Sequence, residues 1–229
     1  MYFYYDWTYI LVLIGAVLSL WASAGVKTTY SKYAKVTALN GITGVEAAER
    51  ILHNAGIYNV RVERVSGRLT DHYDSSAKVL RLSDGVYSSS SIAAIGVAAH
   101  ECGHAIQDKE SYGPLRLRHT LVPIVNFGNF LSMPLFILGL VLGMYDTLVP
   151  IGIFLFSFAV LFQFVTLPVE FNASKRAVTI LSESGMVTRE ETPKVKKVLK
   201  AAAYTYLAAA AASALQLVRL LLLANRRRD

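Results

Sequence analysis

The segment from residue 100 to residue 104 reads His-Glu-Cys-Gly-His and contains residue types that can hold and use a metal ion. On an α-helix, positions i and i+4 differ by about 40° of rotation, so His100 and His104 point the same way and can bind one ion through their imidazole nitrogens. Glu101 directly follows His100, so its carboxylate can lie close to the metal and take a proton from a water molecule there. The spacing therefore predicts a catalytic Zn²⁺ site with two ligands and a general base.

A catalytic zinc site needs a third protein ligand and keeps its fourth position for water. The chain has Gln107 and Glu110 where the metzincin class needs Gly and His, so that class is excluded. Glu170 begins a predicted helix directly after an apolar segment. If the two preceding apolar segments form a transmembrane hairpin, they return the chain to the side of the membrane that carries the HECGH helix. This geometry favours Glu170 over three later glutamates, which are Glu183, Glu190 and Glu191.

Helix signals surround the motif. Four serines at positions 88–91 offer N-caps for a helix that runs through the motif and ends near Asp108. Further upstream, the capping box Thr43–Glu46 begins an amphipathic helix, which Gly56 ends. The motif is therefore expected on a buried helix that packs in a small domain.

Two strands are predicted between these helices. Val and Leu recur at strand spacing over residues 60–65 and 79–82, and turn residues occupy positions 71–76. The second strand lies just upstream of the motif helix. It is a candidate for edge pairing with an extended peptide substrate.

The composition is too apolar for an ordinary soluble domain, with 54% hydrophobic residues and a mean hydropathy of +0.41. Four uncharged segments of 20, 26, 23 and 18 residues can each cross roughly 30 Å of hydrocarbon at about 1.5 Å per residue. The remaining chain is too short to bury four such helices in the core of a soluble protein. We therefore expect four membrane spans, at residues 7–26, 120–145, 147–169 and 201–218.

The charges beside these segments predict their orientation. Met1–Asp6 contains no Lys or Arg, whereas three lysines follow the first segment. This order is typical of an anchor whose N-terminus lies outside, and it argues against a signal peptide cleaved after Ala24. The first and third loops should be cytosolic, because they carry most of the lysines near the spans, among them Lys27, Lys32, Lys35, Lys194, Lys196, Lys197 and Lys200.

The net charge of +7 is spread over loops beside the apolar segments. This distribution favours lipid headgroups as a partner and argues against nucleic acid. The basic tail at residues 226–228 would face outward, against the usual charge rule. The single cysteine excludes an intramolecular disulfide and a Cys-rich zinc site.

Three parts of the sequence together resemble the bacterial YugP-type membrane zinc metallopeptidases, which are similar to the HtpX membrane proteases. These parts are Leu69–Asp74, Ala98–Gln107 and Leu167–Ser174. The resemblance spans nearly the whole chain and implies that Glu170 is the third zinc ligand. Asn172 stands where many relatives have Asp, and Ser174 replaces the Asp of an ExxxD pattern, so the resemblance does not identify the residues that orient the ligating histidines.

We interpret the chain as a mainly α integral membrane protein with about four transmembrane helices and a small α+β zincin-like catalytic domain that contains the HExxH helix. The expected segments are an N-terminal transmembrane anchor (1–26), a soluble catalytic domain (27–119), a transmembrane hairpin (120–169), the third-ligand helix with a cytosolic loop (170–200), and a C-terminal transmembrane helix with a basic tail (201–229).

The predicted activity is that of a zinc-dependent endopeptidase with one Zn²⁺ per chain and no other cofactor. The protein is expected in the bacterial plasma membrane, with a cytosolic catalytic domain and with peptides or proteins as substrates; quality control of membrane proteins is a role suggested by analogy. His72, Tyr73 and Arg176 are candidates for contacting the substrate or its tetrahedral oxyanion. No feature of the sequence specifies an oligomeric state.

Two other functions compete with this interpretation. A site-2-type intramembrane protease would carry HExxH inside a span, but the apolar run at residues 92–99 is too short to cross and charged residues bracket the helix. A proteolytically silent zinc-binding scaffold would need no general base. The intact Glu101 argues against it.

Overall fold

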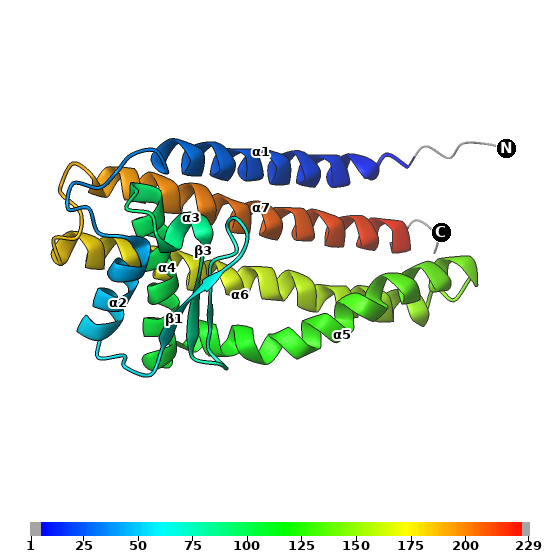
Figure 1. The fold of residues 1–229 in the computed structure, drawn as a ribbon. Helices are drawn as coiled ribbons and strands as arrows, with labels where there is room; N and C mark the ends of the chain where they lie inside the picture. Colours follow the sequence, from blue (N-terminus) through cyan, green and yellow to red (C-terminus); the bar gives the residue numbers. More distant parts are fainter. Residues whose placement is uncertain (1–5, 226–229) are drawn as a thin grey trace. The chain divides into compact units, whose positions relative to one another are not determined.

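The computed structural model describes residues 6–225 and is mainly helical, as predicted (Figure 1). Residues 1–5 of the predicted anchor and the basic tail at 226–229 lie outside the described residues. The chain divides into two compact units. We call them the helical unit (Met1–Ser23, Leu117–Leu167 and Thr205–Asp229) and the mixed unit (Ala24–Arg116 and Pro168–Tyr204).

The mixed unit is built on a three-stranded sheet with the order β1-β3-β2 (Figure 1). The strands β1 (Arg61–Val65) and β3 (Val79–Ser83) pair in parallel, with Val62 opposite Leu80, and β2 (His72–Asp74) pairs antiparallel to β3. The helix α2 (Gly44–Asn54) begins at the predicted capping box, in which Thr43 and Glu46 bond reciprocally. The sheet and α2 pack with α4 (Ile92–Lys109), which carries the HECGH motif.

Two sequence predictions for this unit are wrong in detail. Residues 71–76 were expected to form a turn, but His72–Asp74 is a strand that pairs with β3. A short helix, α3 (Asp84–Tyr87), follows β3 directly. Strand β3 is also flanked by strands on both sides, so it cannot accept a peptide at an edge; the free edges belong to β1 and β2.

Within residues 6–225, four helices are long and apolar enough to cross a membrane: α1 (Tyr9–Tyr33), α5 (Gly113–Val141), α6 (Leu148–Glu183) and α7 (Thr192–Asn225). Between 11% and 28% of the residues in their most apolar windows are buried. Core helices of a soluble protein would have most of these residues covered, whereas Trp21, Phe130 and Phe154 are exposed here. The exposure favours the membrane interpretation over buried core helices.

Helix α6 is longer than the apolar segment that predicts it. It has 36 residues, which corresponds to about 54 Å, and it runs through Glu170 without a break. The helix expected to begin at Glu170 is therefore not a separate element. Glu170 belongs to the part of α6 that lies in the mixed unit.

Close contacts join the helices of the helical unit. A Cβ atom at Gly15 would lie 3.1 Å from the Cα atom of Ala212, so α1 and α7 approach closely where small residues allow it. Arg219 of α7 pairs with Asp6 at 3.2 Å, and its guanidinium carbon lies 4.2 Å from the centre of the Tyr9 ring. The beginning of α1 and the end of α7 therefore lie together, an arrangement compatible with an even number of spans.

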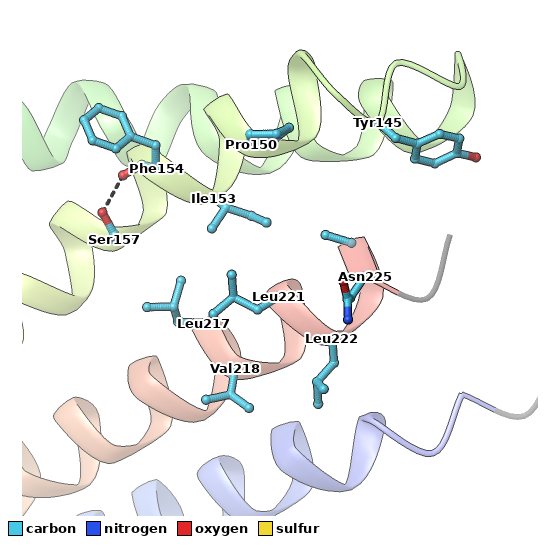
Figure 2. A pocket seen from close by; sticks show the side chains of 11 residues that line it. Tyr145, Pro150, Ile153, Phe154, Ser157, Leu217, Val218, Leu221, Leu222 and Asn225 are labelled. Atoms are coloured by element: carbon cyan, nitrogen blue, oxygen red, sulfur yellow. Dashed lines mark hydrogen bonds between the residues drawn. The ribbon is translucent and has the colours of Figure 1, made fainter. Parts of the chain in front are cut away.

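An apolar pocket lies between α6 and α7 in the helical unit, and Figure 2 shows side chains such as Ile153, Phe154, Leu217 and Leu221 around it. Among the lining residues that the structure describes, Tyr145 is the only titratable group. The described part of the lining offers none of the acids, bases and metal ligands that peptide hydrolysis needs. The chemistry must therefore be sought in the mixed unit.

Candidate metal centre

Helix α4 holds the HECGH motif in a buried position. Its N-cap is Ser91, whose hydroxyl accepts a hydrogen bond from the backbone N–H of Ala94 at 3.2 Å. Most of the side chains in the first two turns are small and fully buried, among them Ala93, Ala94, Ala98 and Ala99. Small residues allow other backbones to approach α4 closely, so the motif is held by packing on several sides.

Gly103 shows how close this approach is. A Cβ atom at this position would lie 2.8 Å from the carbonyl oxygen of Ala173 and 3.1 Å from its Cα atom, and Ala173 is on α6. Contacts this short force backbone to move. Glycine in the motif and alanine in α6 therefore set the separation at which a side chain of α6 can reach the two histidines.

The structure brings together His100, His104 and Glu170, whose ligand atoms all lie within 4.8 Å of one another. The Nε2 atoms of His100 and His104 lie 3.2 Å and 3.5 Å from the same oxygen, Oε2 of Glu170. Ligands bound at 2.0–2.2 Å around a tetrahedral Zn²⁺ are roughly 3.3 Å apart. Two imidazole nitrogens and one carboxylate oxygen at this spacing suit a catalytic zinc ion.

The three side chains are mostly buried but still accessible on one side. The exposed fractions are 13% for His100, 12% for His104 and 3% for Glu170. Burial disfavours the charged form of His104, but the hydrogen bond to Glu170 and the charge of Glu101 outweigh burial and raise its pKa. An anionic environment of this kind also favours a divalent cation.

Two other residues of the motif differ in role from the histidines. Glu101 is buried, and it is not among the three clustered donors. Cys102 is fully buried, and its thiol donates to the backbone carbonyl of Ala48 at 3.6 Å. Burial and the charge of Glu101 raise the pKa of Cys102, so it stays a thiol and packs as a small core residue.

Each histidine also has a partner at its other ring nitrogen. The Nδ1 atom of His100 lies 3.1 Å from Oγ of Ser174, and the Nδ1 atom of His104 lies 3.0 Å from Oε1 of Gln107. A role for Gln107 beside the histidines is not among the predictions from the sequence. Its position three residues after His104 on the same helix was the signal that could have identified it.

The three candidates for contacting the substrate or oxyanion have other partners in the structure. The ring of His72 lies 2.8 Å from the carbonyl of Thr70. Tyr73 donates to Asp108 at 2.7 Å, and burial together with this hydrogen bond raises its pKa. Arg176 donates to Asn172 of α6 and to Glu110, the C-cap residue of α4. A role for these side chains in catalysis stays a prediction.

The other glutamates considered as third ligand are elsewhere. Glu183 and Glu190 are exposed, whereas Glu191 is buried and accepts hydrogen bonds from the backbone N–H groups of Leu39 and Thr188, both at 2.8 Å. Glu191 therefore fixes the chain before α7. None of the three belongs to the cluster around the histidines in the described part of the chain.

Comparisons with known proteins agree with this site. Residues 8–225 match the protein family described as "Putative neutral zinc metallopeptidase". The chain belongs to this family. It is also 50% identical over 222 residues to the "Putative membrane protease YugP" of Bacillus subtilis (strain 168), a match that covers 96% of this chain and 98% of the relative. No solved structure matches the chain.

Family membership makes this metallopeptidase an enzyme that uses zinc, as the sequence predicted. The four candidate spans and the name of the relative agree on a membrane protease homologue with protein substrates. The cluster of His100, His104 and Glu170 offers the donor set that such an enzyme needs.

Proposed function

We propose that the protein is a membrane-anchored zinc endopeptidase in which His100, His104 and Glu170 hold one Zn²⁺ and Glu101 acts as general base. The observation that carries this proposal is the approach of both histidine Nε2 atoms to one oxygen of Glu170. A zinc ion held by these three side chains would still be able to take water or substrate, as catalytic zinc sites with three protein ligands do. The proposal divides the chain into an N-terminal anchor (1–26), a catalytic domain (27–119), a transmembrane hairpin (120–169), a segment with the third ligand (170–200) and a C-terminal span with its tail (201–229).

The residues of the chain divide the work of hydrolysis. When bound, zinc polarises the scissile carbonyl and makes a coordinated water more acidic. Glu101 accepts the proton of the attacking water and then delivers it to the leaving amine. His100, His104 and Glu170 fix the position at which water and carbonyl meet, so the reaction gains from orientation as well as from charge.

The proposed site lies at the boundary of the hydrocarbon layer. The uncharged stretch 147–169 ends directly before Glu170, and the same helix continues beyond it. Substrates would then be segments of protein that emerge from the membrane or approach its surface. Lysines next to the spans favour the cytosolic side and contact with lipid headgroups.

Metal removal tests the proposed function. We expect the purified protein to contain about one zinc per chain, to lose cleavage of an unstructured protein after treatment with a chelator, and to regain it when Zn²⁺ is added back. Zinc is measured by elemental analysis and cleavage by a fluorogenic casein. Mg²⁺ should not restore cleavage, because it prefers oxygen ligands. Absence of zinc, or full cleavage without metal, contradicts the proposal.

Cysteine labelling tests the orientation. Lys35→Cys and Glu190→Cys, each made in a Cys102→Ala background, place single thiols at exposed positions. In sealed cells, an impermeant thiol reagent should not label either position until the membrane is opened, if both loops are cytosolic. Labelling of either cysteine in sealed cells would place that loop outside.

The two competing functions have less support. Helix α4 is not among the four candidate spans of the described chain, which argues against a site-2-type protease with HExxH inside the bilayer. A silent zinc scaffold would not require a buried carboxylate at Glu101, and burial of an ionisable group without a role is costly. Glu101→Gln separates the scaffold from the enzyme, because only an enzyme can lose cleavage while its zinc is retained.

A further inference from the structure

Gln107 is a fully buried amide that bonds to both helices of the metal centre. Its Nε2 atom donates to the carbonyl oxygen of Val169 at 2.8 Å and to Oδ1 of Asn172 at 2.9 Å, and both acceptors are on α6. Its Oε1 atom lies 3.0 Å from Nδ1 of His104, on its own helix α4. All the hydrogen-bonding groups of this side chain are therefore engaged beside the zinc ligands.

The orientation of the neighbouring amide, Asn172, is determined by Arg176. The Nε atom of Arg176 lies 2.7 Å from Oδ1 of Asn172, and its Nη2 atom lies 2.6 Å from Glu110. A guanidinium can only donate hydrogen bonds, so an oxygen of Asn172 must face it. The same oxygen accepts from Gln107, which fixes which end of the Gln107 amide faces α6.

The carbonyl of Val169 leads to the same assignment independently. A backbone carbonyl can only accept, so the NH₂ group of Gln107 must face it, and the oxygen of Gln107 must face His104. An amide oxygen can only accept as well. The Nδ1 atom of His104 must therefore carry a hydrogen, whether the ring is neutral or charged, and Nε2 is the nitrogen whose lone pair can bind a metal.

We propose that Gln107 is a positioning residue that fixes the proton on Nδ1 of His104, directs Nε2 toward the metal, and ties the metal-binding part of α6 to α4. This inference rests on the proposed function in taking His104 as a zinc ligand. The bond to Val169 places the tie next to Glu170 in the chain, so one amide holds the two helices that carry His104 and Glu170. Arg176 and Glu110 set the direction of the whole series of hydrogen bonds.

The two histidines differ in whether their partner at Nδ1 fixes the position of the ring proton. His100 is paired with the hydroxyl of Ser174, which can donate or accept and therefore fixes no proton position. Gln107 is also uncharged, unlike the carboxylate that often supports a ligating histidine. A neutral partner fixes the ring without adding another negative charge beside it. His104 is therefore the more strictly oriented of the two ligands.

A spectroscopic experiment on the full-length protein in micelles tests the position of the proton. In ¹⁵N-histidine spectra, we expect a His104 Nδ1–H signal that exchanges slowly with solvent in both metal-free and zinc-loaded protein. Gln107→Leu should abolish this signal, whereas Gln163→Leu, the same change in the helical unit, should leave it intact. Absence of the signal in the parent, or its survival in Gln107→Leu, would overturn the inference.

A second variant keeps this test decisive if Gln107→Leu does not fold. The carboxylate of Gln107→Glu still accepts from Nδ1 of His104 but cannot donate to α6. We expect the protected Nδ1–H signal to remain in this variant. Its loss would overturn the assignment of Gln107 as the acceptor.

Zinc affinity, measured by competition with a chromogenic chelator, tests the tie to α6. Gln107→Leu should bind zinc roughly 10–100-fold more weakly than the parent. Asn172→Asp keeps an oxygen for both donors and should bind nearly as well as the parent, whereas Asn172→Leu should bind more weakly. Equal losses of zinc affinity in Asn172→Asp and Asn172→Leu would contradict a role for the hydrogen bonds that run from Arg176 through Asn172 to Gln107. A parent that binds no zinc would refute the proposed function, while the Nδ1–H signal would still decide this inference.

Discussion

Glu101→Gln is expected to retain bound zinc and to lose peptide cleavage by roughly 10²–10⁴-fold, the usual contribution of a general acid–base group. Glutamine has nearly the same shape as glutamate but cannot accept the proton of the attacking water. Zinc should stay, because Glu101 is not among the three donors that approach one another. Cleavage of an unstructured protein and bound zinc are measured on the same preparation.

The matched control for this variant is Glu190→Gln, the same change at an exposed position. It should cleave and bind zinc as the parent does. Retained zinc with unchanged cleavage in Glu101→Gln would contradict the proposed mechanism and would favour the silent scaffold. Loss of zinc in Glu101→Gln would show that this carboxylate contributes to the metal site, contrary to our assignment.

Sequence predicts best the features that depend on neighbouring residues. The capping box Thr43–Glu46 begins α2 as expected, and the serines before the motif supply the N-cap of α4 at Ser91. The spacing of His100 and His104 places both rings on one face, because helical geometry follows directly from the sequence interval. Local rules therefore supplied two of the three clustered donors.

Features that depend on distant residues were predicted less well. Strand β2 has three residues, too few for a recognisable alternation, and it exists because β3 pairs with it. The bonds of Gln107 require α6 to lie against α4, and the separation of these helices is set by Gly103 and Ala173. Glu170 was predicted from chain topology and from family resemblance, and the structure places its carboxylate beside both imidazoles.

Glu170→Ala is expected to reduce zinc affinity by more than the roughly 10–100-fold that loss of a supporting partner causes, because it removes the carboxylate from the donor set. The loss should also appear in stability. A metal present at one hundred times its dissociation constant stabilises a folded protein by about 2.7 kcal/mol. The parent should therefore unfold at a higher temperature when zinc is added, whereas Glu170→Ala should not respond.

Glu183→Ala provides the matched control, because Glu183 is an exposed glutamate at the end of the same helix. It should retain zinc and the thermal shift. Measuring the shift produced by zinc, and not the unfolding temperature alone, separates the two effects of removing Glu170: a cavity in a buried site destabilises the metal-free protein as well, but only a ligand changes the response to zinc. Equal zinc affinity in Glu170→Ala and the parent would mean that the third ligand is another residue, and that the contact of Glu170 with the two histidines only supports the fold.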